Sequence, residues 1–75
     1  MTTQQRIAIA VAQGHTTVDA VARLLSLPKE TVLHLVEDSP LVQVGFGDVL
    51  QLTRAAVIVK EAGQVVEVRQ IERVR

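Results

Sequence analysis

The residues that could carry catalytic or metal chemistry are few and do not form a recognisable site. The chain has only two histidines and no cysteine, so no zinc site is expected. Ser26 and Ser39 have no histidine and acid arranged around them by any sequence signal, which leaves nucleophilic catalysis without support. The spacing of the glycines offers no loop to cradle a phosphate. We therefore expect a protein that is not an enzyme, with no metal and no cofactor.

The composition indicates one small globular domain spanning residues 1–75. The chain is 48% hydrophobic, which excludes a disordered protein, but 75 residues lie near the lower size limit for a self-sufficient core. Phe46 is the only aromatic residue, and this argues against binding of single-stranded nucleic acid, where bases stack on aromatic side chains. A small domain without disulfides often gains further core by self-association.

The charges are balanced overall but unevenly distributed. Residues 1–53 hold three basic and five acidic residues, whereas residues 54–75 hold five basic and three acidic residues. The positive end is therefore the tail. The apolar run at residues 7–12 follows a positive charge but is too short for the core of a signal peptide, and no stretch approaches membrane-spanning length. These features lead us to expect a cytoplasmic protein without membrane contact.

The periodicity of apolar residues predicts three helices in the first half of the chain. Thr2 to Gln5 has the Thr-x-x-Gln pattern of a capping box and Gly14 is a suitable stop, so the first helix should span about residues 3–13. Thr16-Thr17-Val18-Asp19 is a second start signal. Pro28 suits the first position of a third helix over 28–38, which Ser39-Pro40 ends. We expect Leu25, Val32 and Leu35 to be buried together.

The pattern changes after Pro40 to one typical of strands. The stretch "LVQVGFGDVLQLT", residues 41–53, predicts a hairpin around Gly45 and Gly47. Residues 54–75 allow a second hairpin around Glu61-Ala62-Gly63-Gln64, or a short helix that begins at Thr53 and ends at Gly63. The density of β-branched residues favours the strands.

The second and third helices with the hairpin after them resemble the winged helix-turn-helix family over residues 17 to about 53. Ala22 occupies the position where that motif needs a small residue, and Leu27, Val32 and Leu35 occupy the apolar positions that lock the helices together. Ser26 departs from the pattern, since the family usually has Gly at that turn, and a positive φ is costlier for Ser. The resemblance implies an α+β fold of three helices, a β-hairpin wing at 41–53 and a β-rich or, alternatively, helical tail.

If the resemblance holds, helix 28–38 is the recognition helix and the protein is a small DNA-binding protein that contacts double-stranded DNA. Such a protein would act as a homodimeric transcriptional regulator or as a DNA-maintenance factor. Lys29 and His34 could each contact a phosphate or a guanine. Glu30 could accept a hydrogen bond from cytosine, and Leu33 could touch a thymine methyl group. The acids of this helix repel phosphates, so affinity would have to come from elsewhere. The expected contacts are Arg23, Lys29, Glu30, Leu33, His34, Phe46, Arg54, Arg69 and Arg73.

A second hypothesis is a winged-helix module for protein–protein contact without DNA binding. Leu33 could be a single exposed leucine of no consequence, or it could form a protein-binding patch with His34 and Phe46. The arginines of the tail alternate with glutamates and are usual for a solvated face, although their clustering is a mild hint of contact with the DNA backbone. The apolar residues 65–74 predict that residues 54–75 form a dimerisation tail.

Overall fold

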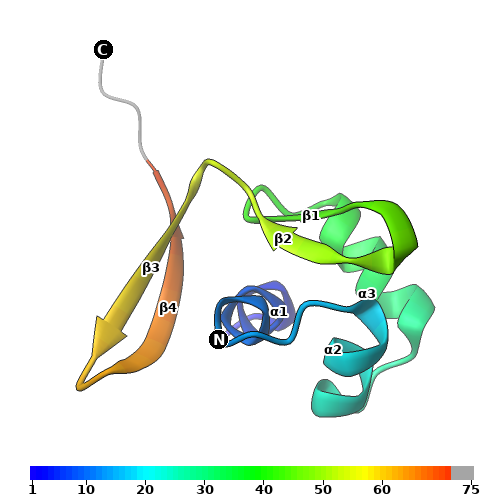
Figure 1. Cartoon of the computed structure of the whole chain (residues 1–75), viewed down its shortest axis with the longest axis horizontal. Coiled ribbons are helices and arrows are strands. Elements are labelled where there is room, and N and C mark those ends of the chain that lie inside the picture. The colour runs from blue at the N-terminus through cyan, green and yellow to red at the C-terminus, as the bar shows by residue number, and fades with distance from the viewer. Residues whose placement is uncertain (72–75) are drawn as a thin grey trace.

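The computed structural model describes residues 1–71 and contains three helices followed by two antiparallel β-hairpins, an α+β architecture (Figure 1). This is the predicted order of elements, and the layout is consistent with a winged helix-turn-helix arrangement. In chain order the elements are α1 (Thr3–Ala12), α2 (Val18–Leu25), α3 (Lys29–Glu37), β1 (Val42–Val44), a 3-10 turn (Phe46–Asp48), β2 (Leu50–Leu52), β3 (Ala56–Glu61) and β4 (Gln64–Gln70).

The starts of the helices are set by local hydrogen bonds. The Thr2 hydroxyl accepts from the backbone N–H of Gln5 at 3.1 Å, and the Thr17 hydroxyl accepts from that of Ala20 at 3.0 Å. Pro28 is the residue that precedes α3, with φ −62° and ψ 146°, and is not the first helical residue as predicted. The predicted capping box is only half formed, because the side chain of Gln5 bonds to β4 and not back to Thr2.

The turn between α2 and α3 places Ser26 in the left-handed region, with φ 56° and ψ 45°. A residue with a side chain pays about 1–2 kcal/mol for this conformation, which is why glycine is favoured there. Ser26 adopts it nevertheless, and the N–H of Leu27 closes the turn by donating to the carbonyl of Ala22 at 2.9 Å. The sharp turn between the helices is thus formed without glycine.

The core lies around α1, which sits between the β3–β4 hairpin on one side and α2, α3 and the first hairpin on the other (Figure 1). Of the three residues expected to be buried together, only Val32 is fully buried, whereas Leu25 and Leu35 are half-buried at the edge of the core. The expectation of full burial was wrong for those two leucines: α3 turns its Val32–Val36 side inward and leaves Leu35 beside it, and Leu25 is the last residue of α2. The buried residues are Ile7, Ala8, Ala10, Val11, Val18, Val21, Ala22, Val32, Val36, Leu41, Val42, Leu50 and Val68.

The hairpin of residues 41–53, which we call the wing, pairs β1 with β2 in the register Val42↔Leu52. Gly47 at its tip has φ 70°, a conformation that glycine adopts without strain. The wing is fixed to the helices at its second strand, where the N–H of Leu50 donates to the carbonyl of Thr16 at 2.7 Å. The side chain of Leu50 is fully buried, so the base of the wing belongs to the core while its tip extends into solvent.

Residues 56–70 form the second predicted hairpin and not the alternative helix. β3 pairs with β4 from Ala56↔Gln70 to Glu61↔Gln64, with an irregularity in the register after Val59. Ala62 and Gly63 between the strands have φ values of 50° and 79°, the pair of positive φ angles that a tight two-residue hairpin turn requires. The hairpin packs against α1 through β4, whose Val68 is part of the same core.

Candidate binding surface

The exposed residues of α3 and of the wing tip form the surface at which a winged helix-turn-helix protein would meet DNA; we call it the α3–wing face. Lys29, Glu30 and His34 are exposed there, as predicted for outward positions of the recognition helix. Leu33 is half-buried and packs against the core. Leu33, the residue expected to contact a thymine methyl, is thus only partly exposed, because α3 packs against both α2 and β1.

The arginine of α2 and the lysine of α3 are both paired with one acid, Asp19. Its carboxylate lies 2.9 Å from the guanidinium of Arg23, one turn along α2, and 3.0 Å from the ammonium of Lys29 at the start of α3. The hydrogen bond from Lys29, followed by the charge of Arg23, lowers the pKa of Asp19 below its ordinary value. The carboxylate therefore stays ionised to a lower pH than an ordinary aspartate does, and its charge offsets part of the positive charge that Arg23 and Lys29 could present to a phosphate.

The remaining charges of this surface are acidic. Glu30, Glu37 and Asp38 on or next to α3, and Asp48 in the wing, are all exposed. Among residues 1–71 the ion pairs involve only Asp19 with its two cations and Glu67 with Arg69, so these four acids have no basic partner there. Residues 19–53 hold two basic and five acidic residues, a net charge of −3. The α3–wing face is therefore negative.

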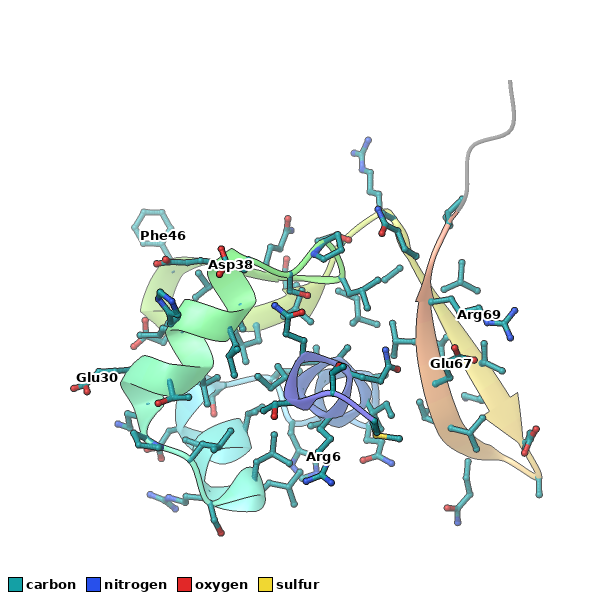
Figure 2. The ribbon with its side chains drawn as sticks, turned by 180° about the vertical axis from the view of Figure 1, so that it is seen from behind. Arg6, Glu30, Asp38, Phe46, Glu67 and Arg69 are labelled. Carbon is teal, nitrogen blue, oxygen red and sulfur yellow. The ribbon has the colours of Figure 1, made fainter. Side chains whose placement is uncertain are left out.

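The wing tip adds apolar surface to this acidic face. The ring of Phe46 is completely exposed, and Val44 and Val49 beside it in the sequence are 39% and 36% exposed. Figure 2 shows Phe46 on the same side of the molecule as Glu30 and Asp38. An aromatic ring left fully in water contributes nothing to the core, whereas aromatic residues are enriched in the centres of protein–protein interfaces.

The basic residues expected to contact DNA are split between separate parts of the fold. Arg54 lies in the loop that joins β2 to β3, and Arg69 lies on β4, where its guanidinium is 3.1 Å from the carboxylate of Glu67. In Figure 2, Arg69 and Glu67 lie at the opposite side of the molecule from Glu30 and Phe46. Arg73, also predicted to bind DNA, lies outside the described residues. Within residues 1–71, the described arginines of the tail and the α3–wing face thus do not form one continuous basic surface.

Two residues with structural importance were not identified as such from the sequence. The double role of Asp19 was partly visible, since Asp19 and Arg23 have the i, i+4 spacing of a helical ion pair, but Lys29 joins them only through the fold. The contact of Gln5 with β4 had no sequence signal, because the two partners are 63 residues apart.

Within residues 1–71, no three His, Asp or Glu side chains gather in a way that could hold a metal ion. Over the same residues, the helices are all too short or too polar to cross a lipid bilayer. No family model, curated protein or solved structure matches the chain.

Proposed function

We propose that this protein is a small winged-helix-like interaction module that binds a positively charged protein segment on the α3–wing face. The observation that carries the proposal is the combination of four exposed acids without basic partners among residues 1–71 and one completely exposed phenylalanine. A partner segment rich in Lys and Arg, with an apolar residue among them, complements both features. Charge complementarity would steer and orient that partner, and burial of Phe46 would supply most of the affinity.

The electrostatic term explains why a basic polypeptide suits this surface better than DNA does. Nucleic-acid affinity comes largely from Lys and Arg side chains that replace the counterions of phosphates. Arg23 on α2 and Lys29 on α3 are each engaged by Asp19, and the further charges of α3, Glu30 and Glu37, repel a phosphate. The same acids attract a basic segment. Exposed charges contribute little one at a time, so the apolar anchor at Phe46 is needed for a stable complex.

The proposal is tested with fluorescence anisotropy on two labelled peptides. One is rich in Lys and Arg and contains two leucines, and the other has each basic residue replaced by Glu. The basic peptide should bind and the acidic one should not, with an affinity that falls as salt rises. Phe46→Ser should weaken binding by about tenfold or more, the loss expected for an interface anchor. Glu37→Gln should weaken it, whereas the matched change Glu61→Gln, on the distant hairpin, should leave it unchanged.

Equal binding of both peptides, or an equal effect of Glu37→Gln and Glu61→Gln, would show that the α3–wing face is not the site.

The second candidate function is binding of duplex DNA as a homodimeric regulator or a DNA-maintenance factor. The exposure of Lys29 and His34 on α3 is the observation that favours it. In that case Lys29→Ala should weaken duplex binding and blur its sequence preference, since Lys29 would contact a base or phosphate of the site.

A further inference from the structure

The outer edge of β4 is closed within the chain by a single side chain. The amide oxygen of Gln5 accepts from the N–H of Val68 at 2.6 Å, and its amide nitrogen donates to the carbonyl of Val68 at 2.9 Å. Both backbone groups of Val68 therefore point at α1 and away from β3. The glutamine takes the place that a neighbouring strand would occupy at this point of the edge, so β4 is not free to pair with another chain there.

This contact also determines which backbone groups of β3 are free. Val68 is opposite Ile58 in the hairpin, and because the backbone of Val68 points outward, that of Ile58 points outward on the other edge. Antiparallel pairs alternate, so Val57 and Val59 bond to β4, while Ile58 and Lys60 face away from it. The hydrogen bond from the N–H of Ile71 to the carbonyl of Ala55, at 2.6 Å, fits the same alternation.

β3 is consequently an open edge strand with apolar side chains. Its only strand neighbour among residues 1–71 is β4. Val57 and Ile58 are 44% and 41% exposed, and this part of the strand carries no charge before Lys60. Natural edge strands are normally protected by charges, prolines or bulges placed along the edge, and two-stranded ribbons are marginal by themselves. Residues 56–59 carry no charge and no proline, and the register irregularity of the hairpin begins only after Val59, next to Lys60.

We propose that β3 pairs antiparallel with β3 of a second copy of this chain, with the two-fold axis at Ile58. The hairpins of the two copies then form one four-stranded sheet. This sharpens the expectation of a dimer through residues 54–75 by naming β3 as the pairing edge, since Gln5 blocks the edge of β4 at Val68. It involves a different surface from the α3–wing face and is independent of the proposed function.

The sequence of β3 is complementary to itself in this register. With Ile58 opposite Ile58 of the second copy, each Val57 lies opposite the second copy's Val59, which gives apolar pairs on both faces of the sheet. The N–H of Ile58 would donate to the carbonyl of the other Ile58, and the N–H of Lys60 to the carbonyl of the other Ala56. Each Lys60 then lies opposite an alanine. An axis at Lys60 would instead place two lysines directly opposite each other.

Sedimentation equilibrium of the full chain, with hydrogen exchange followed by NMR, tests the proposal. The protein should be a dimer at high micromolar concentration. Ile58→Lys should make it monomeric while leaving the circular dichroism spectrum unchanged. The matched variant Val44→Lys changes an equally exposed valine on β1 and should remain dimeric. The amides of Ile58 and Lys60 should exchange faster on dilution, whereas those of Val57 and Val59 should not respond, because they bond within the hairpin.

A monomer at every concentration would overturn the proposal, and so would a dimer that survives Ile58→Lys or is lost with Val44→Lys. If Ile58→Lys fails to fold, the exchange data on the unmodified chain decide the matter. Exchange at Ile58 and Lys60 that does not depend on concentration would then exclude pairing through β3.

Discussion

Replacing Gln5 with alanine tests how the second hairpin is held to the helices. The change removes two hydrogen bonds, of 2.6 and 2.9 Å, between the side-chain amide and the backbone of Val68. Each such bond contributes about 0.5–1.5 kcal/mol net, so the free energy of unfolding should fall by about 1–3 kcal/mol. The N–H and carbonyl of Val68 would be left without their partner, which places the result toward the upper end of that range. Urea unfolding followed by circular dichroism measures the loss.

Gln4→Ala is a matched control for this prediction. Gln4 is the neighbouring residue on α1, is also half-buried, and makes a single hydrogen bond of 3.2 Å to the carbonyl of Leu35. The gain in helix propensity from Gln to Ala is the same in both variants and cancels in the comparison. Gln5→Ala should therefore cost about twice as much as Gln4→Ala. A loss below about 0.5 kcal/mol, or one no larger than that of Gln4→Ala, would refute the role assigned to Gln5.

Three further predictions concern stability. Leu50→Ala, at a fully buried position, should lower the free energy of unfolding by about 2–5 kcal/mol. Leu24→Ala, at a half-exposed position, should lower it far less. Similar urea midpoints for the two variants would contradict the core described above. Ala62→Asn should raise the thermal midpoint, because Asn tolerates the positive φ of 50° better than Ala; a lower midpoint would argue against that turn. The lowered pKa of Asp19 stabilises the fold above the ordinary pKa of an aspartate, and this contribution is lost as the pH falls through the lowered pKa. Asp19→Asn should abolish that acid-dependent loss, as measured by unfolding against pH.

The parts of the fold that depend on local chemistry were predictable from the sequence. Thr2 and Thr17 cap their helices through bonds to residues three positions along, and Gly63 supplies a turn conformation, so element types and the hairpin turns follow from short stretches. The burial of individual leucines was less predictable. Leu33 and Leu35 flank the inward side of a nine-residue helix, and a small rotation of that helix decides how far each of them is covered.

The acidic character of the candidate site could be predicted from the sequence, but the spatial arrangement of its charged residues could not. The acids at Glu30, Glu37 and Asp38 are visible in the sequence, whereas the pairing of Lys29 with Asp19 requires the turn between α2 and α3 to bring them together. The separation of Arg69 from α3 follows from the side of α1 on which the second hairpin packs. Contacts between residues so distant in the chain carry no local signal.

NMR titration of the isotopically labelled protein is the most direct test of the central claim, that the α3–wing face binds a basic polypeptide. The basic peptide and a mixed-sequence DNA duplex are added separately at about 50 mM salt, where phosphate contacts are strong. The claim predicts that the peptide shifts the amide signals of Glu30, Glu37 and Phe46, and that the duplex leaves them in place. Shifts of Lys29 and His34 caused by the duplex, with none caused by the peptide, would contradict it and identify the protein as a DNA-binding one.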